Sequence, residues 1–179
     1  MPKSKKESKK IMLAGLNNSG KTSIVLSLIG KVNLMNFFDL SPTIGADIVN
    51  YVIDDSEFHI FDLGGQAQFR KDYIKDFLNY FEGADKLIYV IDIQDTKRYD
   101  MALEYLKLIC ENLQKNEIKL DINIFLHKMD PNIEDVMENY SREKINAFAK
   151  DIRNNIPEDF FFEIYETTIY TTFEKKIFL

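Results

Sequence analysis

Residues 15–22 read Gly15-Leu16-Asn17-Asn18-Ser19-Gly20-Lys21-Thr22 and fit the pattern G-x-x-x-x-G-K-[ST]. The apolar run Ile11–Leu16 predicts a short buried strand before this stretch, and Lys21–Ile29 predicts a helix after it. In such a turn the glycines let the backbone wrap around phosphate groups, and N–H groups at the helix start point toward them. We expect Lys21 to reach the β- and γ-phosphates and Thr22 to ligate Mg2+. The alternative, a Gly-rich turn without a ligand, is disfavoured because motif and flanks agree. The expected nucleotide contacts in this loop are Asn17, Asn18, Ser19, Gly20, Lys21, Thr22 and Ser23.

Strand-like and helix-like stretches alternate along the rest of the chain. Strands are predicted at Ile48–Ile53, Phe58–Phe61, Lys86–Ile93, Ile122–Leu126 and Phe160–Tyr165, and helices at Phe69–Phe81, Tyr99–Gln114, Arg142–Asn154 and Tyr170–Phe178. Such alternation implies right-handed crossovers in an α/β fold, with a mainly parallel six-stranded sheet and helices on both faces. Ligands of such sheets bind at the carboxyl ends of the strands.

A second motif, Phe61-Asp62-Leu63-Gly64-Gly65-Gln66, follows a predicted strand. Here Asp62 can accept from a water molecule on Mg2+, and Gly65 can offer its N–H to a γ-phosphate. Gln66 can orient the attacking water. The alternative is an ordinary turn at the end of a strand, which the preceding phosphate-binding motif makes less favourable.

A third motif, Leu126-His127-Lys128-Met129-Asp130, also follows an apolar strand. The Asp130 carboxylate can accept from both N1–H and the N2 amino group of guanine, donors that adenine lacks, and Lys128 can lie along the base. The alternative is a polar strand-to-loop exit. For His127 we favour a contact with guanine N7 or with the phosphate-binding loop over a purely structural role. His59, by contrast, alternates with apolar neighbours on a strand and is expected to be structural.

Three motifs in this order resemble the Ras-superfamily GTPases over nearly the whole chain, which implies the P-loop NTPase (small GTPase) fold. By this resemblance, Thr43 in Ser41-Pro42-Thr43-Ile44-Gly45 is the switch I threonine that ligates Mg2+ and senses the γ-phosphate. Pro42–Gly45 and Asp62–Gln66 are similar to the Arf-type versions of switch I and switch II. His127–Asp130, Leu87–Asp92 and Glu163–Tyr170 are similar to Rag/Gtr GTPases. In that alignment Thr167 and Thr168 replace the base-contacting loop, so a backbone N–H near Ile169 faces the guanine O6.

The resemblance implies a slow GTPase that binds GTP or GDP with Mg2+ and acts as a molecular switch. Gln66, Lys21 and Thr43 are the expected catalytic residues, and Thr22, Thr43 and, through water, Asp62 are the expected metal site. A non-catalytic guanine-nucleotide-binding module, as one subunit of a Rag-like heterodimer, is the alternative; a P-loop ATPase or nucleotide kinase is weaker because it leaves Lys128 and Asp130 unexplained. Three departures stand out: His127 replaces Asn, Asn17 replaces a Gly of many relatives, and the sequence stops shortly after Tyr170, where Rag proteins continue into a roadblock-type domain.

Composition agrees with one globular unit. The 179 residues are 45% hydrophobic and 13% aromatic, enough for a sizeable core. The formal charge is −6 although the first ten residues hold five lysines and one glutamate, so the body is acidic and unsuited to nucleic acid. We therefore expect a flexible basic tail at residues 1–10 and a GTPase domain at residues 11–179.

The ends and the single cysteine bear on location and partners. Residue 2 is Pro and no Cys lies near the C-terminus, which predicts no lipid anchor; weak contact between the basic tail and a membrane is the less favoured alternative to a solvated tail. Cys110 recurs with apolar residues at helical spacing and is expected in the core, and the default compartment is the cytoplasm. Expected partners are activating and exchange factors, effectors, and a homo- or heterodimer with another GTPase or a roadblock-type protein.

Overall fold

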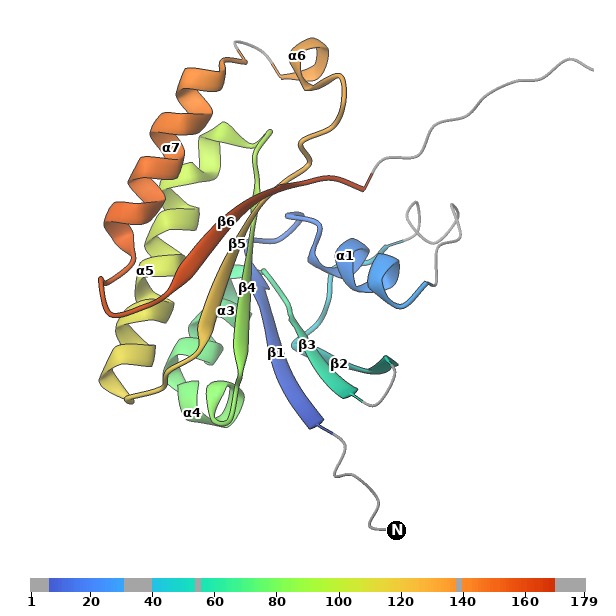
Figure 1. The fold of residues 1–179 in the computed structure, drawn as a ribbon, viewed down its shortest axis with the longest axis vertical. Coiled ribbons are helices and arrows are strands. Elements are labelled where there is room, and N and C mark those ends of the chain that lie inside the picture. Colours follow the sequence, from blue (N-terminus) through green and yellow to red (C-terminus); the bar gives the residue numbers. More distant parts are fainter. Residues whose placement is uncertain (1–6, 31–39, 54–55, 138–139, 170–179) are drawn as a thin grey trace, which may run out of the picture.

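The computed structural model describes residues 7–30, 40–53, 56–137 and 140–169. Six strands form one sheet in the order β2-β3-β1-β4-β5-β6 (Figure 1). Their bounds are β1 Glu7–Gly15, β2 Ala46–Ile53, β3 Ser56–Leu63, β4 Lys86–Asp92, β5 Asp121–His127 and β6 Phe162–Thr167. Only the β2–β3 pair is antiparallel, and the other four pairs are parallel. The predicted mainly parallel six-stranded sheet is confirmed.

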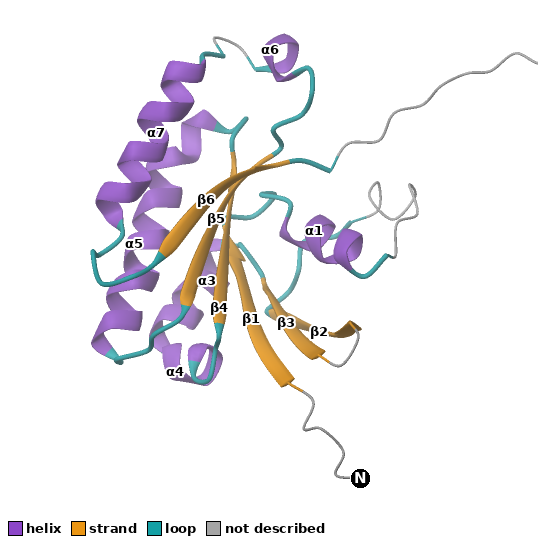
Figure 2. Cartoon of the chain, in the orientation of Figure 1, coloured by secondary structure: helices purple, strands orange, loops and turns teal. Residues whose placement is uncertain are grey.

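Helices cover both faces of this sheet, as expected. They are α1 Lys21–Leu28, α3 Ala67–Lys75, α4 Phe77–Phe81, α5 Tyr99–Lys115, α6 Ile133–Val136 and α7 Arg142–Asn155, with a short 3-10 turn η1 Thr96–Arg98. Helix α1 lies on one face, and α3, α5 and α7 lie on the other (Figure 2). The carboxyl ends of the parallel strands meet at one edge of the sheet, next to the start of α1 (Figure 1).

Strand β1 shows how the two faces are packed. Met12 and Ala14 point into the larger apolar cluster with α5 and α7, whereas Leu13 joins Ile24 and Val25 of α1 in the smaller one. Alternate residues of a strand face opposite sides of a sheet, so a strand buried on both faces is apolar throughout. Cys110 is fully buried in the larger cluster, and its predicted core position is confirmed.

The boundaries differ from expectation at several places. Strand β1 begins at Glu7 rather than Ile11, because Lys10 donates its backbone N–H to Asp85 Oδ2 at 2.7 Å and its ammonium to the Glu82 carbonyl at 2.8 Å. Residues 7–10 therefore belong to the sheet and not to the tail. The single helix expected at Phe69–Phe81 is wrong; the helical path breaks at Asp76, whose ψ of 42° separates α3 from α4.

Two expectations fall on residues that the structure does not describe. The helix predicted at Tyr170–Phe178 and the first six residues of the basic tail lie outside the described ranges. Within those ranges, no helix is both long enough and apolar enough to cross a membrane.

Candidate functional site

The loop between β1 and α1 depends on two glycines. Gly15 has a φ of 147°, and a Cβ there would lie 2.2 Å from the Val90 carbonyl oxygen of β4. Gly20 has a φ of 94°, and a Cβ there would lie 2.5 Å from the His127 ring. Left-handed backbone at both positions and these close approaches require glycine. The loop thus wraps tightly over the ends of β4 and β5.

Lys21 is the first residue of α1 and points back under the loop. Its ammonium donates to the Leu16 carbonyl at 2.8 Å and to the Gly15 carbonyl at 3.3 Å, and the residue is 6% exposed. Burial lowers the Lys21 pKa to about 8, and the attraction of Asp62 offsets this only in part. A buried cation bound to carbonyl oxygens is placed to gain from an anionic ligand.

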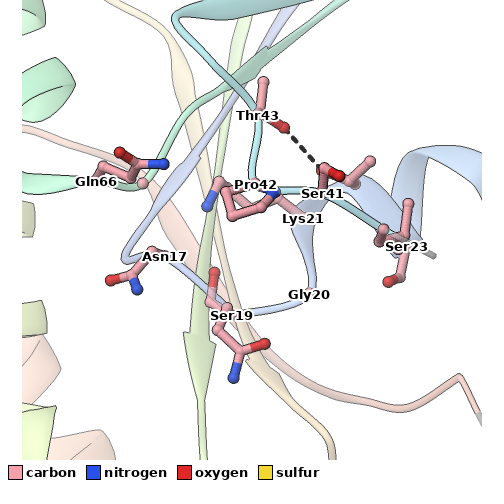
Figure 3. Close-up of a pocket in the computed structure, with 13 residues that line it drawn as sticks. Asn17, Ser19, Gly20, Lys21, Ser23, Ser41, Pro42, Thr43 and Gln66 are labelled. Atoms are coloured by element: carbon pink, nitrogen blue, oxygen red, sulfur yellow. Dashed lines mark hydrogen bonds between the residues drawn. The ribbon is translucent and has the colours of Figure 1, made fainter. Parts of the chain in front are cut away.

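A cavity of about 270 Å³ opens over this loop (Figure 3). The loop, the segment before β2 and the segment after β3 all line it, through Asn17, Asn18, Ser19, Gly20, Lys21, Thr22, Ser23, Leu40, Ser41, Pro42, Thr43, Gly65 and Gln66. All residues expected to meet the phosphates, and Gln66 with them, therefore surround one space. The structure thus brings together three segments that are far apart in sequence.

Three oxygen-bearing side chains converge at the floor of this site. Thr22 Oγ1 donates to Asp62 Oδ2 at 2.5 Å and lies 3.1 Å from Thr43 Oγ1, and Thr43 Oγ1 lies 3.4 Å from the same carboxylate oxygen. Asp62 is 2% exposed, and its Oδ1 has no hydrogen-bond partner among the described residues. Burial is the main cause that raises the Asp62 pKa. A buried, incompletely satisfied carboxylate beside two hydroxyls is an oxygen set that suits Mg2+.

The two segments that follow β1 and β3 are in direct contact. The Asn17 backbone N–H donates to the Gly65 carbonyl at 3.0 Å, and a Cβ on Gly65 would lie 2.2 Å from that nitrogen. Gly65 is thus a close-approach glycine. Gln66 follows it at the wall of the cavity, with extended backbone just before α3 begins (Figure 3).

His127, Lys128 and Asp130 lie beside the loop rather than in this cavity. His127 is 3% exposed, bonds through Nδ1 to Thr167 Oγ1 at 2.9 Å, and presents its other ring edge to Gly20. Burial is the main cause that lowers the His127 pKa, so the ring is neutral at pH 7. The ring therefore packs against the loop between β1 and α1.

Lys128 and Asp130 join this loop to the ends of β4 and β6. The Lys128 ammonium bonds to the Asn18 carbonyl at 2.9 Å and to Asp92 Oδ2 at 2.6 Å. Asp130 accepts from Thr168 Oγ1 at 2.5 Å, and Ile169 follows Thr168 as a half-buried residue against the smaller core cluster. The carboxylate predicted to read the base is thus held in a fixed position beside a hollow that Thr167 and Thr168 also line.

Two residues that the motifs did not identify also hold the site. Gln94 donates its amide to Asp130 Oδ2 at 3.1 Å and to the Lys128 carbonyl at 2.8 Å. Arg98 donates to the Asn17 carbonyl at 3.1 Å and to Asn17 Oδ1 at 2.9 Å. The one sequence signal for them is their place just after β4, at the edge where ligands of parallel sheets bind.

The G-x-x-x-x-G-K-[ST] loop and two further segments line one cavity at the carboxyl edge of a mainly parallel sheet, which is the architecture of a small GTPase of the Ras superfamily. The sequence model described as "Gtr1/RagA G protein conserved region" matches residues 10–178, so the chain belongs to the Gtr1/RagA family of G proteins.

Curated relatives are Arf-like. The chain is 36% identical to ADP-ribosylation factor-like protein 2 of Arabidopsis thaliana over 64% of its own length and 56% of that protein's. It is 30% identical to ADP-ribosylation factor-like protein 6 of Caenorhabditis elegans over 67% of its own length and 60% of that protein's. The match therefore spans less than two thirds of these relatives.

A solved structure agrees with the fold. The Arl6 BBS3 small GTPase of Trypanosoma brucei, solved with the nucleotide analogue GppNp, superposes with a TM-score of 0.68 at 20% identity over 90% of this chain and 87% of that one. The relationship to both the Rag and the Arf groups, expected from the motifs, is confirmed.

Proposed function

We propose that this protein binds GTP and GDP with Mg2+, hydrolyses GTP slowly and acts as a nucleotide-dependent switch. The observation that carries the proposal is the convergence of Thr22, Thr43 and Asp62 within hydrogen-bond distance at the floor of the P-loop cavity. These side chains come from three separate segments. A ligand that contacts all three segments would account for the unpaired Asp62 Oδ1 beside the two hydroxyls.

The oxygen set fits Mg2+, which when bound would neutralise charge on the β- and γ-phosphates. Thr22 and Thr43 would be direct ligands, and Asp62 would act through a water molecule. Lys21 would exchange its carbonyl partners for phosphate oxygens. The N–H groups of the loop from Asn17 to Ser23 would also donate to phosphate oxygens. Gly65 would offer its N–H to the γ-phosphate.

Hydrolysis would depend on Gln66, which lines the same cavity and would orient the attacking water. The stretch from Gly30 to Asp47 contains no arginine. Arg98 is engaged with Asn17 and Asp95, the latter at 2.5 Å. With no arginine directed at the cavity from these positions, turnover would be slow, on the order of 10^-4 to 10^-2 s^-1, and an activating partner would raise it.

Base choice would rest on Asp130. Its carboxylate would accept from the guanine N1–H and N2 amino groups, while Lys128 would lie along the base. A backbone N–H near Ile169 would face O6, and His127 would support the loop or donate to N7. The fixed hold of Gln94 and Thr168 on Asp130 supports this role, because a preorganised acceptor loses little freedom on binding.

The γ-phosphate would hold the segments around Thr43 and Gln66 in place, and its loss would release them. Effectors would distinguish the two states, and exchange and activating factors would control the rates of nucleotide exchange and hydrolysis. A second GTPase or a roadblock-type protein would be a dimer partner, and the expected location is the cytoplasm or the periphery of a membrane.

The alternative is a non-catalytic guanine-nucleotide-binding module in a Rag-like heterodimer. Chromatography of the nucleotide released from purified, denatured protein tests the shared claim of guanine binding. GDP or GTP is the expected result, and ADP or ATP would contradict it. Continued hydrolysis of added radiolabelled GTP separates the switch from the module.

A further inference from the structure

The hydroxyl of Tyr73 lies where the segment after β3 meets the segment before β2. It donates to the Gly45 carbonyl at 2.7 Å and accepts from the Gly64 N–H at 3.0 Å. The same N–H also donates to the Gly45 carbonyl at 2.8 Å. Three polar atoms from three segments thus bond to one another.

This junction is closely packed. A Cβ on Gly64 would lie 2.5 Å from the Thr43 carbonyl and 2.8 Å from the Gly45 carbonyl, so the two backbones touch. Tyr73 is 1% exposed and belongs to the larger core cluster. Its ring meets the Tyr80 ring edge-on at a centroid distance of 4.8 Å. The core therefore fixes the position of the hydroxyl.

The hydroxyl is a donor under physiological conditions. Burial raises the Tyr73 pKa to about 12, so the group stays protonated at neutral pH. Removal of its oxygen would leave the Gly64 N–H to Gly45 bond in place. The hydroxyl therefore adds hydrogen bonds between two segments that already contact each other through their backbones.

The two segments that it ties are those that carry the γ-phosphate contacts in the proposed function, on which this inference rests. Gly45 follows Thr43 by two residues, and Gly64 precedes Gly65 directly. A contact made in one state and lost in another favours the first state by its own free energy. We propose that Tyr73 is a positioning residue whose hydroxyl couples switch I to switch II and so favours GTP over GDP.

The test is Tyr73→Phe, which keeps the ring and its volume. The dissociation constants of a fluorescent non-hydrolysable GTP analogue and of fluorescent GDP are measured in the presence of Mg2+. We expect the affinity for the GTP analogue to fall about threefold to tenfold and the affinity for GDP to stay unchanged. Tyr80→Phe is the matched control, because its hydroxyl makes no hydrogen bond within the described part of the chain; it should leave both affinities unchanged.

A second measurement separates coupling from a general loss of packing. If the hydroxyl acts by holding switch I in place, Tyr73→Phe should have little further effect on GTP-analogue affinity in a Thr43→Ala background. An equal loss of affinity for both nucleotides, or no change in either affinity, would overturn the proposal. Wild-type guanine-nucleotide binding is the independent readout of the proposed function, so a failure there is distinct from a failure of Tyr73.

Discussion

The buried ammonium of Lys21 predicts a pH dependence of nucleotide binding. In the nucleotide-free protein the Lys21 pKa falls from 10.5 to about 8, first because of burial and then because Arg70 and Arg98 oppose the attraction of Asp62. Phosphate groups would raise this pKa again. Above pH 8, binding must therefore take up one proton, and GDP affinity should weaken about tenfold between about pH 7 and about pH 9.

The stability of the nucleotide-free protein should change in the opposite direction. Between the folded pKa of about 8 and the unfolded value of 10.5, the unfolded chain binds more protons at Lys21. The contribution of Lys21 to stability therefore rises with pH in that window. Nucleotide should remove this rise, because the bound lysine stays charged.

Calorimetric titration of GDP in two buffers of different ionisation enthalpy measures both affinity and proton uptake. The base also loses its N1 proton in the alkaline range, so Lys21→Arg is the reference, because arginine does not titrate there. Wild type should lose more affinity with pH than this variant. The same slope for both proteins, with no extra proton taken up by wild type, would refute the reasoning.

Other residues give further predictions. Asp130→Ala should lower the affinity for GDP at least about a hundredfold, because it removes the acceptor for two guanine donors. Equal affinity of the wild type for ADP and GDP in titrations would rule out base selection by Asp130. Excess chelator should speed GDP release, and Thr22→Ala should release GDP quickly even with Mg2+; an unchanged off-rate would argue against the metal site. Gly20→Ala should destabilise the protein by about 1–3 kcal/mol in thermal unfolding and impair GDP binding, through its φ of 94° and the clash with His127. Gly83→Ala is the control, because Gly83 also has a positive φ but a Cβ there would lie in open space. If Gly83→Ala impaired GDP binding as well, the steric explanation would be wrong.

The parts that local sequence determines could be predicted. The P-loop and the Asp62–Gln66 turn carry their geometry in a few adjacent residues, so their places at strand ends followed directly. The start of β1 could not be found in this way, because lysines at its beginning hide the strand pattern. The Lys10 ammonium lies 4.8 Å from the centroid of the Phe61 ring, and the Lys10 backbone N–H donates to the Asp85 carboxylate. These contacts exist only after the sheet forms.

The residues that support the site were hidden for the same reason. Arg98 meets Asn17 across 81 positions, Gln94 meets Asp130 across 36, and Tyr73 meets Gly45 across 28. Each belongs to a helix, a turn or a strand end whose local pattern is complete without it. A motif identifies a group that touches the ligand, whereas a group that holds the first one in place is found only from the tertiary contacts.

In the proposed function, GTP hydrolysis in the cavity depends on Gln66. Single-turnover release of radiolabelled γ-phosphate, followed over long incubations with Mg2+, tests it in wild type and Gln66→Leu. Because the side chain would act on the transition state, Gln66→Leu should bind GTP nearly as well as wild type and release phosphate at least about tenfold more slowly. Equal measurable rates for the two proteins would contradict the role of Gln66. An undetectable wild-type rate would contradict the hydrolysing switch and would support the non-catalytic nucleotide-binding module.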